Sequence, residues 1–138
     1  MATQTAPPAT RRRKMPGQKR LLAASVLILV GAFLPWLYTA FGTFTGMRGP
    51  GLWTATVGLL ALAGAIVPVR VLAVLQGAAA AAICIAVPLW QFVHMFSMVG
   101  MQGWMPGPGL VLTLGGGVLA AVASWQLWSL RAAPAPTA

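Results

Sequence analysis

The chain has 138 residues, of which 59% are hydrophobic and 7% are charged, and it contains no Asp or Glu. A soluble domain carries about 25% charged residues, so this composition excludes an ordinary soluble domain. Without carboxylates, acid–base catalysis by Asp or Glu and a carboxylate proton relay are also excluded, and we expect the protein not to be an enzyme.

The N-terminal segment, residues 1–20, is polar and ends in a basic cluster directly before a hydrophobic stretch. We expect it to be a disordered cytoplasmic segment. The net charge of +9 could indicate nucleic acid, but a nucleic-acid surface spreads its basic residues over a folded face. A basic flank beside an apolar run is typical of a membrane topology signal, and it can also contact anionic lipid headgroups. The cluster comprises Arg11, Arg12, Arg13, Lys14, Lys19 and Arg20.

Four uncharged apolar segments follow, each close to the length of about 20 residues that a spanning helix needs. The first has the charged flank of a signal peptide, but it is too long for one and no A-x-A site follows, so we predict a retained helix. The sequence therefore predicts an all-α membrane protein with two hairpins, at 21–69 and 70–130, and a short cytoplasmic tail at 131–138. The segments are Leu21–Phe41, Gly51–Val69, Val71–Val93 and Gly109–Leu130.

The distribution of basic residues predicts the orientation of these four transmembrane helices. With both termini in the cytoplasm, all nine Lys and Arg residues except Arg48 lie inside, including Arg70 and Arg131. The inverted orientation would place that majority outside, against the positive-inside rule. We expect a multi-pass protein of the cytoplasmic (inner) membrane, with Arg48 contacting lipid phosphate or water. A contact with an acidic residue of a partner protein is the alternative for Arg48.

A short sequence motif that contains glycine, methionine and proline occurs twice, as "GMRGPGL" at 46–52 and "GMQGWMPGPGL" at 100–110. The correspondence extends upstream, where Trp36 matches Trp90. Each half is therefore predicted to be a helical hairpin with a Gly-rich outer turn. A unit of two spans re-enters the membrane in the same orientation, so the repeat should be parallel. Proline at a helix start and glycine in a reversal indicate a structural turn, with a ligand loop as the alternative.

Small residues at four-residue spacing predict how the helices pack, because such lanes let helices approach closely in lipid. The proposed lanes are Ala78, Ala82 and Ala86 on the third segment, and Gly116, Ala120 and Ser124 on the fourth. Pro35 and Pro88 are expected to kink the first and third helices. Paired breaks mark binding sites in some transporters, but packing is the simpler interpretation here.

One group of side chains could bind a soft metal. Thioether sulfur suits Cu(I), and three-residue spacing brings sulfurs together on a helical turn. The alternative is that these methionines are flexible apolar filler. One His and one Cys cannot form a zinc site within one chain, and we expect no cofactor. The soft-metal candidates are His94, Met95, Met98, Met101 and Met105.

The stretch "GAFLPWLYTAFGTFTGMRGPGLWTATVGLLALAGA" resembles a class of small, uncharacterised actinobacterial four-helix membrane proteins with a duplicated LPW and Gly-rich-turn hairpin. The resemblance implies architecture and membrane location, and no activity or functional residue comes with it. Our leading hypothesis is an accessory or scaffold subunit that packs against a larger membrane complex or against copies of itself. The alternative is a small channel or holin-like pore, or a copper-handling transport protein.

Overall fold

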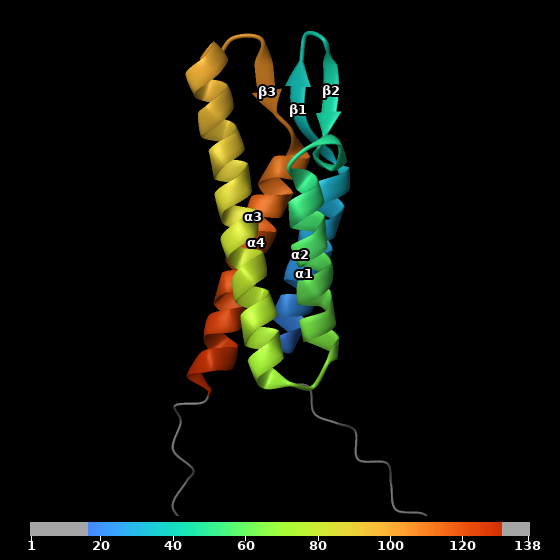
Figure 1. Ribbon diagram of the computed structural model, residues 1–138, viewed down its shortest axis with the longest axis vertical. Helices are drawn as coiled ribbons and strands as arrows, with labels where there is room; N and C mark the ends of the chain where they lie inside the picture. The colour runs from blue at the N-terminus through green and yellow to red at the C-terminus, as the bar shows by residue number, and fades with distance from the viewer. Residues whose placement is uncertain (1–16, 131–138) are drawn as a thin grey trace, which may run out of the picture.

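Four helices run in alternating directions and pack side by side in the computed structural model, which describes residues 17–130 (Figure 1). Helices α1 and α3 each pack against both α2 and α4, and lie diagonally opposite each other. The hairpins therefore form one four-sided bundle, as the sequence led us to expect in outline. The helices are α1 (Gln18–Phe33), α2 (Gly51–Ile66), α3 (Arg70–Val99) and α4 (Pro108–Ser129).

A small antiparallel sheet at one end of the bundle corrects the all-α prediction. Its strands are β1 (Pro35–Thr39), β2 (Gly42–Thr45) and β3 (Trp104–Pro106), in the order β2-β1-β3. Strands β1 and β2 come from the first turn and β3 from the second, so the sheet joins the two halves. A 3₁₀ helix, η1 (Gly46–Arg48), leads into α2. We call this the sheet end, and the opposite end, where α1 and α3 begin, the terminal end.

The first helix was predicted too long. Helix α1 ends at Phe33, and Leu34 is extended, with φ −76° and ψ 163°. The residue before a proline favours this conformation. Pro35 then begins β1, a strand position that tolerates a missing N–H, so the prediction that Pro35 kinks a helix is wrong. Pro88, by contrast, lies inside α3, which continues to Val99.

The two halves share their helix starts but not their turns. Pro50 directly precedes α2 and Pro108 begins α4, as the repeated sequence motif predicts. Trp36, however, lies on β1, whereas its counterpart Trp90 lies on α3. The second turn also places Gly100 in the left-handed region, with φ 64°, which glycine tolerates. The repeat therefore specifies where the second helix of each half begins, while the path into it differs.

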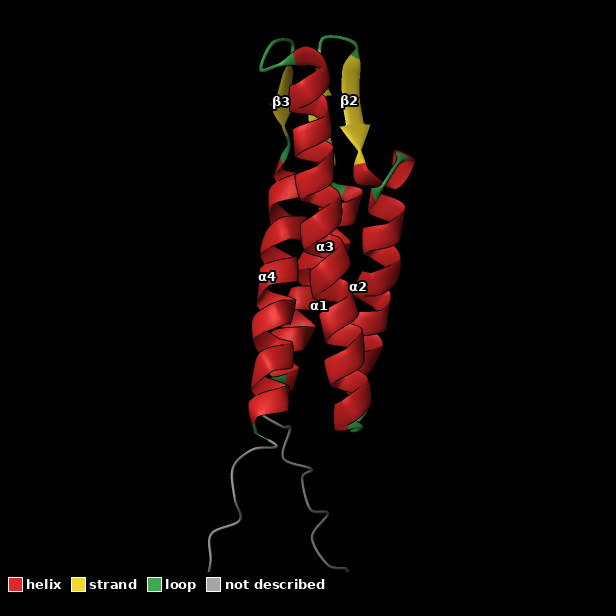
Figure 2. Cartoon of the chain, turned by 60° about the vertical axis from the view of Figure 1, so that its left-hand side comes forward, coloured by secondary structure: helices red, strands yellow, loops and turns green. Residues whose placement is uncertain are grey.

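Two of the helices, α3 and α4, are long and apolar enough to cross a membrane. Helix α3 has 30 residues and α4 has 22, which correspond to about 45 Å and about 33 Å. The hydrocarbon core of a bilayer is about 30 Å thick. Helices α1 and α2 have 16 residues each, or about 24 Å. The last turns of α3 therefore extend beyond the other helices and rise beside the sheet (Figure 2).

Candidate functional site

The surface and the core of the bundle are built from different kinds of apolar residue. The buried core consists largely of small side chains, whereas large apolar side chains point outward. Phe33 is 63% exposed, Leu59 57% and Trp125 71%. In water this surface would be an extensive apolar patch. In lipid, helices associate through small residues at their contacts, and acyl chains surround the large ones. The fully buried alanines are Ala24, Ala32, Ala61, Ala73, Ala80, Ala120 and Ala123.

Helices α1 and α4 approach each other closely where Gly31 faces Gly109. A Cβ added to Gly31 would lie 2.8 Å from the backbone nitrogen of Thr113 and 2.9 Å from the carbonyl oxygen of Gly109. A Cβ on Gly109 would lie 2.6 Å from the carbonyl oxygen of Gly31. Both contacts involve backbone atoms, which cannot rotate away. The crossing therefore depends on glycine at both positions.

The two predicted small-residue lanes have different positions in the structure. Gly116, Ala120 and Ser124 are buried in the bundle, and the Ser124 hydroxyl donates to the Ala120 carbonyl at 2.8 Å. The lane on α3 is instead exposed, so it does not form the contacts of α3 within this bundle. A four-residue spacing recurs on several faces of an alanine-rich helix, so it could not select the buried face. The exposed lane is Ala78, Ala82 and Ala86, and the buried face of α3 carries Ala73, Gly77, Ala80, Ala81 and Cys84.

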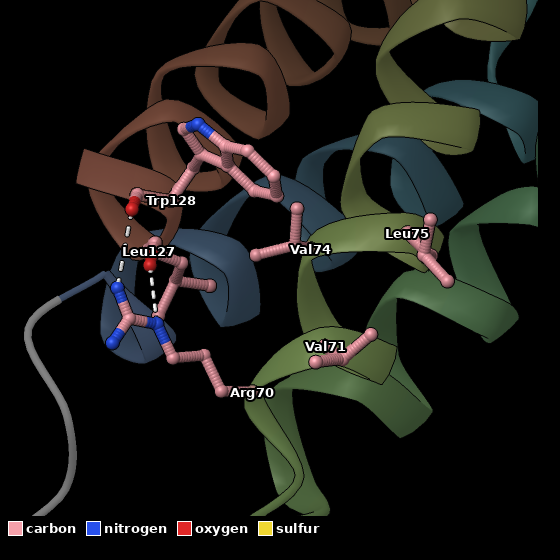
Figure 3. Close-up of a pocket in the computed structure, with 6 residues that line it drawn as sticks. All are labelled: Arg70, Val71, Val74, Leu75, Leu127 and Trp128. Carbon is pink, nitrogen blue, oxygen red and sulfur yellow. Dashed lines mark hydrogen bonds between the residues drawn. The ribbon is translucent and has the colours of Figure 1, made fainter. Parts of the chain in front are cut away.

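A groove opens at the terminal end between the start of α3 and the last turns of α4 (Figure 3). Its volume is about 200 Å³. The Arg70 side chain reaches across to α4, where its Nε donates to the Leu127 carbonyl at 2.5 Å and its Nη2 donates to the Trp128 carbonyl at 3.2 Å. The remaining lining is apolar and comes from Val71, Val74, Leu75, Leu127 and Trp128. This is the candidate site, which we call the Arg70 groove.

The contacts of Arg70 serve the end of α4 as well as the groove. The last carbonyls of a helix lack partners within it and carry partial negative charge. Helix α4 has no basic residue in its own last turn, and Arg70 supplies the cation from 57 residues away in the chain. From the sequence, Arg70 was expected only to set the topology and to contact lipid. The pairing left no signal in the sequence, because it depends on how α3 and α4 are placed.

The terminal end also gathers other positive charge. Lys19 and Arg20 are exposed in the first turn of α1, which lies beside α4, since a Cβ on Gly17 would lie 2.9 Å from the Leu127 side chain. The chain contains no Asp or Glu that could neutralise them. The predicted topology residues Arg11, Arg12, Arg13, Lys14 and Arg131 lie outside the described residues. The described cations at this end are therefore Lys19, Arg20 and Arg70.

At the sheet end, aromatic side chains hold the sheet against the bundle. Trp36 is buried, and its indole N–H donates to the Gly31 carbonyl at 2.9 Å, which satisfies an otherwise unpaired carbonyl in the last turn of α1. Trp104 is buried from the other half and makes an edge contact with Phe92, with ring centroids 5.6 Å apart. Arg48 is exposed beside a hollow of about 200 Å³ that Trp36 and Gln91 also line.

The soft-metal candidates are spread around this end. His94 stacks on Trp90, with ring centroids 5.1 Å apart. Met95 packs against the buried cluster that contains Trp104. Met105 follows Trp104 along β3, and successive strand residues point to opposite faces, so Met95 and Met105 lie on opposite sides of the sheet. Met98 and Met101 are exposed. Within residues 17–130 no three His, Cys, Asp or Glu side chains could hold a metal ion, and binding of a soft metal by the methionines stays a prediction.

No family model matches this chain, and the comparison with curated protein sequences found no match. Its function must therefore be inferred from the geometry of the bundle and of its two ends.

Proposed function

We propose that the chain is an integral membrane protein with four spans and both termini in the cytoplasm, and that it acts as an accessory or scaffold subunit. It packs against a larger membrane complex or against copies of itself. The observation that carries the proposal is the arrangement of small residues inside and large apolar residues outside. That arrangement stabilises a bundle whose surroundings are acyl chains and other membrane helices.

The charges and aromatic residues support the orientation. Lys19, Arg20 and Arg70 lie at the terminal end, and Arg48 lies at the sheet end. The positive-inside rule then assigns the terminal end to the cytoplasm. Trp125 and Trp128 near this end suit the inner interface. The sheet, whose edge strands carry unpaired backbone groups, belongs outside the hydrocarbon region, because lipid cannot satisfy those groups.

The packed interior favours a scaffold over a pore within one chain. Leu21 and Leu127 fill the centre of the bundle near the terminal end, Ile28 fills its middle, and Thr54 and Thr113 lie nearer the sheet end. Each of these side chains is fully buried. The absence of Asp and Glu from the sequence also removes the usual acid–base groups of an enzyme.

The outward face of α3 supports packing against another membrane helix. The exposed lane of Ala78, Ala82 and Ala86 presents little side-chain volume, so a neighbouring helix could approach its backbone closely. We expect a partner, or further copies of this chain, to lie along this face. Ala82→Leu should weaken that association, whereas Val118→Leu, on the exposed surface of α4, should not.

Gentle detergent extraction followed by mass spectrometry tests the role. We expect a fixed stoichiometry of a partner protein or of this chain, reduced by Ala82→Leu and unchanged by Val118→Leu. A monomer that causes ion leakage when it is overproduced would instead indicate the pore-forming alternative.

Single-cysteine labelling tests the topology, because the native Cys84 is fully buried. In a Cys84→Ala background, we expect an impermeant maleimide to label Thr43→Cys, at the sheet end, on intact cells. Arg20→Cys should react only after the membrane is permeabilised. The opposite pattern would refute the orientation, and recovery of the chain as a water-soluble monomer would refute the membrane assignment.

A further inference from the structure

We infer that the Arg70 groove binds an anionic phospholipid of the cytoplasmic leaflet. The Arg70 guanidinium contacts the lipid phosphate, and the apolar wall of the groove contacts the first part of an acyl chain. The inference rests on the proposed membrane orientation, which places this end of the bundle at the inner headgroup region.

The guanidinium is fixed at the mouth of the groove and still has donors to offer. Its contacts with the carbonyls of Leu127 and Trp128 hold one edge of the planar group against α4 (Figure 3). An arginine has more N–H donors than these two contacts use. Arginine can therefore bond carbonyls on one side and a phosphate on another, which a lysine ammonium cannot do with the same fixed geometry.

The shape and lining of the groove favour a lipid over a free phosphate. Val71, Val74 and Leu75 form one wall on α3, and the Trp128 indole faces them from α4 (Figure 3). A soluble anion would contact only the guanidinium and leave the apolar walls uncovered. A phospholipid satisfies both parts, because its phosphate and its first methylene groups lie at adjoining depths. Tryptophan side chains are also enriched at this depth of a membrane.

Charge complementarity selects an anionic lipid over a zwitterionic one. Lys19 and Arg20 lie at the same end as Arg70, and no carboxylate side chain exists in the chain to balance them. A headgroup with net negative charge is attracted to each nearby cation. The choline of a zwitterionic lipid would instead bring another positive charge close to these three residues.

The test uses the full chain purified in dodecyl maltoside and titrated with dioleoylphosphatidylglycerol or dioleoylphosphatidylcholine. Native mass spectrometry measures the number of lipids bound and their affinity. We expect one phosphatidylglycerol to bind at least about tenfold more tightly than phosphatidylcholine, since more than one cation contributes. Equal affinity for the two lipids would overturn the inference.

Two variants locate the binding. Arg70→Gln should lower the affinity for phosphatidylglycerol about fivefold. Because this change also removes the contacts with α4, Val71→Trp provides a second probe that fills the groove and keeps Arg70. It should remove the tight site, whereas Leu72→Trp, at the adjacent position outside the groove lining, should leave it intact. Arg48→Gln, at the sheet end, is the matched charge control and should have no effect.

The outcomes separate this inference from the proposed function. If labelling confirms the topology but Val71→Trp binds phosphatidylglycerol like the unmodified protein, the groove is not the lipid site and the membrane proposal stands. If labelling places the terminal end outside the cell, both proposals fail.

Discussion

Three consecutive glycines on α4 allow a sharp test of how closely the helices pack. A Cβ added to Gly115 would meet no atom within 4 Å. A Cβ on Gly116 would lie 2.7 Å from Ile28 Cγ1 and 3.1 Å from the Ala24 carbonyl oxygen. A Cβ on Gly117 would lie 3.0 Å from the Cys84 carbonyl carbon. Gly115 thus faces the exterior of the bundle, Gly116 faces α1 and Gly117 faces α3.

The expected energies follow from two opposing effects. Replacing glycine by alanine inside a helix stabilises the helix by about 1 kcal/mol at each of these positions. Overpacking a tight contact costs about 1–3 kcal/mol. Gly115→Ala should therefore stabilise the protein by up to about 1 kcal/mol. Gly116→Ala and Gly117→Ala should be about 1–3 kcal/mol less stable than Gly115→Ala, because the helix gain is common to all three.

The measurement is the free energy of unfolding in mixed micelles, with SDS added until helical circular dichroism is lost. A double variant, Gly116→Ala with Ile28→Ala, should be less destabilised than the sum of the two single changes, because the methyl group enters the space left by the isoleucine. Equal stability of the three alanine variants would refute the close packing of α4 against α1 and α3.

Three further predictions concern buried side chains. Trp36→Phe should lower the free energy of unfolding by about 1–3 kcal/mol, because it leaves the Gly31 carbonyl without its hydrogen-bond donor. Trp104→Phe should lower it less, since the bond from Trp104 to the Gly100 carbonyl is only partly buried. SDS unfolding that ranks the two variants in the reverse order would contradict this. Gln76→Met should leave the free energy of unfolding unchanged or raise it by about 1 kcal/mol, because the buried Gln76 Oε1 has no hydrogen-bond partner among the described residues. A loss of stability would show that the Gln76 side-chain amide is hydrogen-bonded in the folded protein. Cys84 should resist N-ethylmaleimide in the folded protein and react after SDS unfolding, since it is 0% exposed. Mass spectrometry would detect the modification, with Thr43→Cys as the reactive control. Labelling of Cys84 before SDS is added would indicate an open bundle.

The comparison of α1 with α4 shows where the sequence signal was sufficient. The boundaries of α4 were predicted within one residue, because proline and glycine mark its start and a long apolar run leaves no alternative conformation. The apolar run from Leu21 to Phe41 continues past the end of α1 at Phe33, and Pro35–Thr39 within it pair as β1. That strand forms only because β2 and β3 are available beside it, and hydrophobicity does not record such partners.

The sequence by itself determined that the chain is apolar, that it forms four helices and that its described basic residues, except Arg48, lie at one end. These properties follow from composition and from the order of apolar segments, which are local. Only the tertiary structure decided which alanine face of α3 is buried and that Arg70 meets the end of α4. Both depend on the rotation and position of helices distant in sequence, because small residues allow several close packings and only the complete bundle selects one.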